Sequence, residues 1–299
     1  MRLDAPLPPP GKVGVWAWWL VTHPAEEVRN AAGAVEDLGY GALWFPESTG
    51  REAFTTASLL LEATDRVVVA PGIANLWARD PTAMAAGAQA LGEAHPGRFV
   101  LGIGVSHAPS VARRGATYRR PLQVMRSYLD GMEEAAYMGP QADPEVPVVL
   151  AALGPKMLSL AGERTAGAHP YFVPVEHTAL ARDVLGHGPF LAPEQAVVLQ
   201  TDPGRARSIA RRHMSRYLAL DNYANNLRRL GWSDGDLLDG GSDALVDALV
   251  AWGDVAAIAE RLAAHFAAGA DHVSIQVLSD DPEIPLGGLE ALSGALSGL

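Results

Sequence analysis

Residues 146–167, "VPVVLAALGPKMLSLAGERTAG", contain the unit from which the fold is built. The first part, residues 146–152, is a short run of branched and small apolar side chains and predicts a buried strand. Pro155 then opens a stretch rich in Ala, Leu and Glu that predicts a helix, because a proline in the first helical turn loses no hydrogen bond. A strand followed directly by a helix is typical of α/β proteins with a parallel sheet.

The same alternation recurs along the whole chain. Strand-like runs are predicted at residues 13–18, 41–45, 67–73, 98–105, 146–152, 169–174, 195–200 and 271–278. Helical stretches between them are predicted at residues 24–39, 81–95, 121–138 and 155–167. These eight predicted strands, alternating with helices over 299 residues, predict a closed (β/α)₈ TIM barrel.

No linker or shift in composition divides the chain, so residues 1–299 are expected to form a single domain. Residues 201–270 hold several predicted helices between the last two strands and are interpreted as a helical insertion. A doubly wound open sheet is the alternative fold. Against it, "GIGVSH" has Gly102 and Gly104 but His107 where the third glycine of a dinucleotide-binding G-x-G-x-x-G belongs.

The composition excludes several classes of function. A net charge of -11, spread along the chain, disfavours binding to nucleic acid or anionic membranes, so a small-molecule substrate is expected. The absence of cysteine excludes disulfides, thiolate metal sites and thiol nucleophiles. No apolar run reaches the roughly 18 residues of a membrane span, and "MRLDAPLPPPGK" has no signal-peptide core. A soluble, cytoplasmic protein is expected.

In a barrel of this kind, chemistry gathers at the carboxyl ends of the strands. Pro46 ends the second predicted strand and Glu47 follows it, where a carboxylate could act as an acid, a base or an anchor. A solvated loop carboxylate without a catalytic role is an equally good interpretation of Glu47. After the third strand, Gly72 indicates a bulge or a close approach of the backbone to a ligand, although an ordinary loop is possible.

The fourth strand ends in "LGIGVSHAPS", where Gly104 lets the chain pass close to a ligand. Ser106 and His107 then offer a hydroxyl and an imidazole, although a single loop histidine is more often structural than catalytic. No second histidine lies at metal-ligand spacing, so no metal site is predicted.

The fifth strand leads into Gly154, Pro155 and Lys156 at a predicted helix start. Free N–H groups there, with a lysine charge, favour a phosphate or another anion, and a capping turn with a surface lysine is the alternative. The arginine-rich residues 113–120 could reach an anionic tail but are interpreted as a solvated loop. Trp16 and Trp18 are expected on one face of the first strand and Trp19 on the other.

No serine–histidine–aspartate order, phosphate-binding Walker loop or metal triad appears. The residues therefore predict a barrel with a flat or phosphorylated ligand at its mouth and do not specify the reaction.

Five segments together resemble the luciferase-like monooxygenase superfamily, and most closely its oxidoreductases that use the deazaflavin coenzyme F420. They are "GYGALWFPES", "VVVAPGIANLWARDP", "GRFVLGIGVSH", "PVVLAALGPKMLSLAGERTAGAHPYFVP" and "GDVAAIAERLAAHFAAGADHVSIQVL", in this order. The resemblance covers nearly the whole chain.

The resemblance implies a TIM barrel with a late insertion, a homodimer, and a flavin-like ring at the carboxyl ends of the strands. It implies a cis peptide at Gly72–Ile73, with Ala74 beside it, against which the ring rests. It also implies that the backbone from Leu153 to Lys156 holds the cofactor phosphate. Pro46, Gly104 and Ser106 complete the expected cofactor site, and Glu47 and His107 are the expected catalytic residues.

Two departures from this family leave the substrate open. Where the characterised dehydrogenases have Asp-His after the second strand, this chain has Pro46-Glu47, and about Val105 stands where the sugar-phosphate enzymes have a glutamate. The leading hypothesis is an F420-dependent oxidoreductase acting by hydride transfer. An FMN-dependent monooxygenase and a non-catalytic cofactor-binding barrel are the alternatives.

Overall fold

The computed structural model describes residues 1–296 and 298. Its strands are β1 (Val13–Trp16), β2 (Ala42–Phe45), β3 (Val68–Pro71), β4 (Ala74–Asn75), β5 (Leu101–Gly104), β6 (Val148–Leu150), β7 (Gly167–Ala168), β8 (Phe190–Leu191), β9 (Glu194–Leu199), β10 (Val250–Gly253) and β11 (Val273–Val277). Its helices are α1 (Trp19–Thr22), α2 (Ala25–Asp37), α3 (Ala53–Leu61), α4 (Pro81–Ala94), α5 (Ala108–Arg113), α6 (Pro121–Glu133), α7 (Pro155–Arg164), α8 (Val175–Leu185), α9 (Pro203–Leu218), α10 (Asp221–Arg229), α11 (Asp243–Leu249), α12 (Val255–Ala267) and α13 (Leu286–Leu296), with a 3₁₀ segment η1 (Gly235–Gly240).

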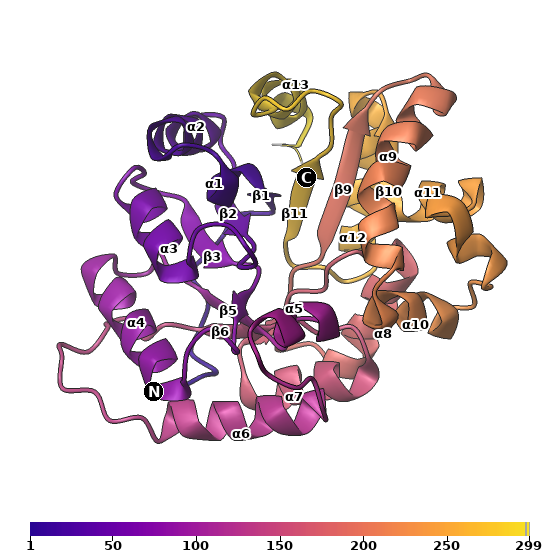
Figure 1. Cartoon of the computed structure of the whole chain (residues 1–299). Coiled ribbons are helices and arrows are strands. Elements are labelled where there is room, and N and C mark those ends of the chain that lie inside the picture. The colour runs from indigo at the N-terminus through magenta and orange to yellow at the C-terminus, as the bar shows by residue number, and fades with distance from the viewer. Residues whose placement is uncertain (297, 299) are drawn as a thin grey trace.

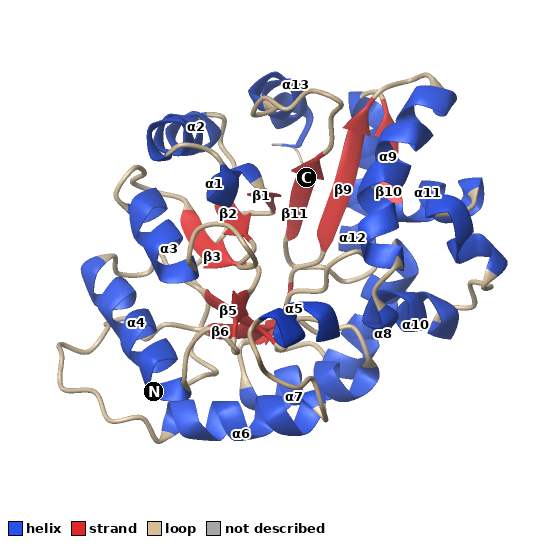
Figure 2. Ribbon diagram, viewed as in Figure 1, coloured by secondary structure: helices blue, strands red, loops and turns tan. Residues whose placement is uncertain are grey.

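Parallel pairing joins these strands into a ring. One sheet has the order β10-β9-β11-β1-β2-β3 and the other β4-β5-β6-β7-β8. The chain itself connects the two sheets, because β3 continues into β4 across Gly72–Ile73 and β8 continues into β9 across Ala192 and Pro193. A bridge between Val69 and Phe99 adds pairing at the first junction. The strands of the described residues therefore form the predicted barrel, with helices around it (Figures 1 and 2).

Side chains alternate between the two faces of the ring, as strand geometry requires. On β2, Leu43 and Phe45 pack outward against the surrounding helices, whereas Ala42 and Trp44 point into the ring. The inner cluster continues under α9 and α11, which lie together at one side of the barrel with α10 (orange in Figure 1). None of the described helices is both long and apolar enough to cross a membrane.

The predicted first and sixth strands were partly wrong. β1 ends at Trp16, so Trp18 precedes α1 and Trp19 lies within that short helix. At the sixth position only Gly167–Ala168 pairs as β7, and residues 169–174 form a loop. Two prolines in that loop have no N–H to donate, and Phe172 has a left-handed φ of 58°, so the ladder cannot continue.

The segment predicted as an all-helical insertion also contains a strand. Residues 250–253 lie within the predicted helical insertion, but α11 ends at Leu249 and these four residues form β10. β10 pairs in parallel with β9 outside the ring. Arg261 donates to the carbonyls of Asp247 and Ala248 at the end of α11, so contacts distant in sequence override local helix propensity.

A buried carboxyl group lies inside the ring at the start of β9. Glu194 accepts a 3.2 Å hydrogen bond from the N–H of Phe172, but its second oxygen has no partner among the described residues. Burial raises the pKa of Glu194 from 4.5 to about 8. The folded chain therefore holds a proton on Glu194 at neutral pH, where the unfolded chain does not.

We predict that Glu194→Gln flattens the pH dependence of stability. The folded wild type binds one more proton than the unfolded chain between pH 4.5 and about 8, so it loses stability as pH rises through this window. The difference in melting temperature, variant minus wild type, should grow by about 2 °C or more per pH unit below pH 8 and then level off. Thermal melts from pH 6 to 9 check this, and a constant difference would contradict it.

Candidate functional site

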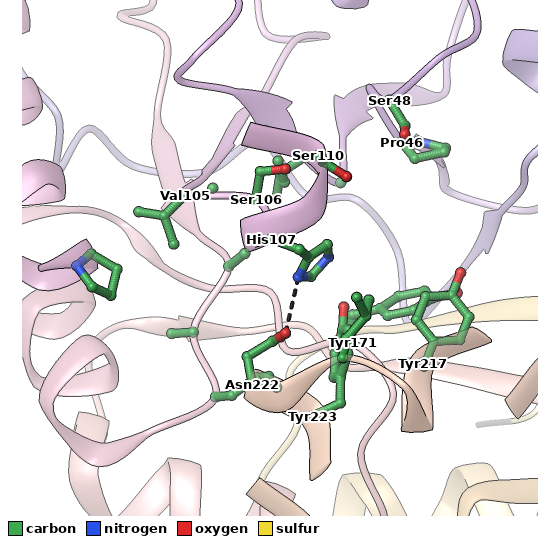
Figure 3. Close-up of a pocket in the computed structure, with 18 of the residues that line it drawn as sticks. Pro46, Ser48, Val105, Ser106, His107, Ser110, Tyr171, Tyr217, Asn222 and Tyr223 are labelled. Carbon is green, nitrogen blue, oxygen red and sulfur yellow. Dashed lines mark hydrogen bonds between the residues drawn. The ribbon is translucent and has the colours of Figure 1, made fainter. Parts of the chain in front are cut away.

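A cavity of about 740 Å³ opens at the carboxyl ends of the strands. Its barrel side is formed by the segments that follow β2, β3, β5 and β6, and its other side by the end of α9 and by α10. Figure 3 shows His107 extending from the β5 loop towards Asn222 of α10, with Tyr171, Tyr217 and Tyr223 nearby. The cavity is within the size range of cofactor and substrate sites.

The floor of the cavity is the junction between β3 and β4. The Gly72–Ile73 peptide is cis, which confirms the expectation from the resemblance. Trp16 Nε1 donates a 3.2 Å hydrogen bond to the Gly72 carbonyl. A Cβ atom on Gly72 would lie 2.7 Å from His169 Nε2, and one on Gly104 would lie 2.5 Å from Ile73, so both glycines are required by close packing. Gly72, Ile73 and Gly104 line the cavity.

Glu47 and Pro46 both reach the cavity wall, but the Glu47 carboxylate is buried and fully engaged. It accepts hydrogen bonds from the N–H of Asn75 at 2.7 Å and the N–H of Ala53 at 3.2 Å. Both terminal nitrogens of Arg79 also bind it, one of them at 3.0 Å. These four donors occupy the acceptor positions of the carboxylate, so Glu47 holds together the segments after β2 and β3.

The β5 loop brings Ser106 and His107 to the cavity, as the sequence suggested. Ser106 has a left-handed φ of 59°, a conformation that turns the chain sharply at the strand end. His107 Nδ1 lies 3.0 Å from Asn222 Oδ1. Because an amide oxygen only accepts, Nδ1 carries the hydrogen and Nε2 is left with a lone pair. Burial lowers the pKa of His107, so the ring is neutral at physiological pH.

The β6 loop presents only part of the predicted anion site. Leu153 and Gly154 line the cavity, and the Leu153 carbonyl accepts a 2.8 Å hydrogen bond from His177 Nε2. Pro155 and Lys156 are exposed and are not among the lining residues; Ala74 is buried in β4, behind the wall. Arg229 of α10 also approaches the loop, and its guanidinium nitrogen lies 3.4 Å from the Cβ position of Gly154.

Sequence reasoning missed the contribution of α9 and α10. These helices and the short turn between them supply Arg216, Tyr217, Leu220, Asn222, Tyr223, Asn225 and Arg229 to the cavity. The signal was the run "RYLALDNYANNLRR", whose tyrosines, asparagines and arginines are too polar for a helix serving only to pack. From the arginine-rich residues 113–120, only Arg113 and Tyr118 line the cavity, which agrees in part with a solvated loop.

The cavity is positively charged in an acidic protein. Arg113, Arg216 and Arg229 line it, and Glu47, paired with Arg79, is its acidic side chain within the described residues. The chain as a whole carries a net charge of -11. The cavity can therefore attract an anion that the remaining surface repels.

One relative by sequence is a named oxidoreductase. A protein of Mycobacterium tuberculosis, named provisionally as a coenzyme F420-dependent oxidoreductase, is 31% identical over 169 residues, which are 56% of this chain and 46% of that protein. The chain thus matches about half the length of this relative.

Two solved structures share the fold. An F420-dependent secondary alcohol dehydrogenase in complex with an F420-acetone adduct superposes with a TM-score of 0.77 at 15% identity, over 99% of both chains. The oxygenating constituent of 3,6-diketocamphane monooxygenase from Pseudomonas putida, in complex with FMN, gives 0.69 at 18% identity, over 96% of this chain and 98% of that one. At these identities, the likeness establishes the barrel fold alone.

The family model described as luciferase-like monooxygenase matches residues 12–272. This range includes the whole of α9 and α10 and every barrel strand except β11. The match therefore covers the cavity from both sides. On this basis, the chain belongs to the luciferase-like monooxygenase family.

Proposed function

We propose that this chain is an oxidoreductase that transfers a hydride between coenzyme F420 and a small organic substrate. The observation that carries the proposal is the gathering of Arg113, Arg216 and Arg229 around one cavity of an acidic chain. Coenzyme F420 is a deazaflavin whose side chain bears a phosphate and carboxylates, and these cations would attract it. The relative from M. tuberculosis and the alcohol dehydrogenase of similar fold are both named for this coenzyme.

The residues of the cavity fit such a molecule. Ile73 and Gly104 offer a shallow apolar surface for a flat ring, since neither carries a polar side chain. Gly154 precedes the first turn of α7, where the N–H groups of Gly154 and Lys156 make no hydrogen bond with any described residue and therefore favour a phosphate. Arg229 lies beside Gly154 and supplies the charge at this end.

When bound, the deazaflavin supplies or takes up the hydride. The role proposed for His107 is to accept a proton from a substrate hydroxyl, or a hydrogen bond from it, through Nε2. Asn222 fixes the tautomer that this role requires. Because burial lowers the pKa of His107, the acceptor form persists down to mildly acidic pH.

For Glu47, the contacts favour a positioning role over the catalytic role expected from the sequence. Its donors come from α3, β4 and Arg79, and Arg79 itself is bound by Glu52 at 2.6 Å. A carboxylate held by this many donors fixes the edge of the cavity next to the Gly72–Ile73 floor. Proton transfer by Glu47 stays a prediction that the variants below test.

An FMN-dependent monooxygenase is the second candidate, because a protein of the same fold binds FMN. FMN also combines a flat ring with a phosphate, so Ile73, Gly154 and Arg229 would suit it as well. The two candidates differ in the negative charge that lies beyond the phosphate. Only coenzyme F420 has a longer tail that bears carboxylates, and Arg113 and Arg216 would pair with that tail.

We predict that the purified chain binds coenzyme F420 at least tenfold more tightly than FMN, the scale of about 1.4 kcal/mol for the additional ion pairs. Parallel calorimetric titrations measure both dissociation constants. Raising the salt concentration should reduce the difference between the two constants, because exposed charges are screened. Tighter binding of FMN, with oxygen uptake driven by a nicotinamide reductant, would support the monooxygenase instead.

We predict that Arg229→Ala weakens coenzyme F420 binding by about fivefold or more, the scale of a lost charge-assisted hydrogen bond. Lys156→Ala is the matched control, since it removes a cation from the same loop region outside the cavity lining. It should change the dissociation constant less than Arg229→Ala. The reverse order would restore Lys156 as the cation of the anion site.

We predict that Glu47→Gln lowers the stability of the protein, because breaking a buried ion pair leaves Arg79 uncompensated at a cost of about 3 kcal/mol. The melting temperature should fall by roughly 6 °C or more. Glu52→Gln is the control, since it removes a half-exposed partner of the same arginine and should have a smaller effect. An unchanged melting temperature combined with a turnover reduced about 100-fold would instead identify Glu47 as a catalytic acid or base.

A further inference from the structure

The part of the cavity beneath α9 and α10 is walled by aromatic rings. We call it the aromatic chamber and define it by Trp16, Trp18, Tyr171, Tyr217 and Tyr223. The ring centroids of Trp16 and Tyr171 lie 4.7 Å apart, and those of Tyr171 and Tyr217 lie 5.1 Å apart. The chamber lies beside the Gly72–Ile73 floor because Trp16 binds the Gly72 carbonyl.

Two of the three tyrosine hydroxyls in the chamber are already engaged. Tyr171 and Tyr217 lie 2.8 Å apart at their hydroxyl oxygens, and Tyr171 also contacts Gln276 Oε1 at 2.9 Å. Trp18 Nε1 donates to the Tyr217 hydroxyl at 3.3 Å. These contacts form a closed set that offers no spare donor to a ligand.

The hydroxyl of Tyr223 differs from the other two. It makes no hydrogen bond with any described residue, and it is not among the unpartnered polar atoms that are sealed from solvent. The Tyr223 oxygen is therefore accessible, and Tyr223 lines the cavity. Its ring is held in place by Tyr217 at 5.4 Å, Phe172 at 5.4 Å and His107 at 5.3 Å between centroids.

The chemistry of the chamber selects a type of ligand. Flat aromatic walls favour a flat apolar body over a hydrated one. Burial raises the pKa of Tyr223 well above 10, so this hydroxyl stays protonated and can act as a donor at all physiological pH values. The guanidinium of Arg216 lies over the ring of Trp18, 5.7 Å from its centroid.

We propose that Tyr223 donates a hydrogen bond to an acceptor oxygen of the substrate, and that the aromatic chamber holds the uncharged, flat apolar body of a carbonyl compound. The inference rests on the proposed function in treating this ligand as the substrate beside the cofactor. Tyr223 lies in the first turn of α10, so the same helix supplies the substrate donor, the partner of His107 and the cation at Gly154.

The test measures binding of two probes of the same shape by equilibrium dialysis. The first is 2-acetylnaphthalene, which has a carbonyl oxygen; the second is 2-isopropenylnaphthalene, in which a CH₂ group replaces that oxygen. Wild-type protein should bind the ketone more tightly. Tyr223→Phe should weaken ketone binding about five- to tenfold, the scale of one hydrogen bond, and leave hydrocarbon binding unchanged.

Tyr118→Phe is the matched control, because it removes another cavity hydroxyl, outside the aromatic chamber, that has no hydrogen-bond partner among the described residues. It should leave both dissociation constants unchanged. Equal ketone binding by wild type and Tyr223→Phe, a ketone-specific loss in Tyr118→Phe instead, or no preference of the wild type for the ketone would each overturn the proposal.

A second series with saturating coenzyme F420 separates this inference from the proposed function. A Tyr223-dependent ketone preference without any F420 binding would overturn the coenzyme assignment and support the chamber. F420 binding without a ketone preference in either series would support the coenzyme assignment and overturn the proposal for the aromatic chamber. Thermal melts of both tyrosine variants confirm that they fold like the wild type.

Discussion

The carboxylate of Glu47 and the guanidinium of Arg79 form a buried ion pair that joins segments distant in sequence. Only 4% of the Glu47 side chain and 10% of the Arg79 side chain are exposed. The pair receives further hydrogen bonds from the start of α3 and from β4, so the charges are compensated where they are buried. The ends of β2 and β3 are thereby fixed, and the Gly72–Ile73 floor between β3 and β4 is held at one edge of the cavity.

This arrangement separates the charges near the cavity into a neutralised pair and a set of available cations. Glu47 and Arg79 neutralise each other within the wall, whereas Arg113, Arg216 and Arg229 remain available at the cavity. The barrel thus supplies a floor of glycine and isoleucine, and the later helices α9 and α10 supply cations, amides and aromatic rings. A site built from both parts can hold an anionic cofactor on one side and an apolar substrate on the other.

Much of the barrel could be predicted from the sequence, because buried parallel strands are short apolar runs and helices that follow them begin with proline. The prediction was wrong where pairing with a neighbouring strand, and not the apolar pattern of the local sequence, decides whether a segment forms a strand. In "HPYFVP" the apolar residues predict a strand, but the two prolines prevent the pairing. β10 forms from a helical pattern because β9 lies beside it.

The candidate site was predictable only on its barrel side. Gly72, Gly104, His107 and Gly154 lie at or just after strand ends and were predicted from that position. Asn222, Tyr223 and Arg229 come from a segment more than 60 residues after the last of these, and nothing local shows that α10 folds back over the cavity. The same limit applies to the role of Glu47. Its position at the end of a strand was predicted, but its ion-pair partner, Arg79, lies 32 residues away in the sequence.

The most direct test of the central claim is a crystal structure of the chain with oxidised coenzyme F420. We predict that the deazaflavin ring lies against Ile73 and Gly104, and that the phosphate of the coenzyme lies beside Gly154 and Arg229. A ring bound elsewhere, or a phosphate held on the opposite side of the cavity, would contradict the assignment of this barrel mouth as the cofactor site.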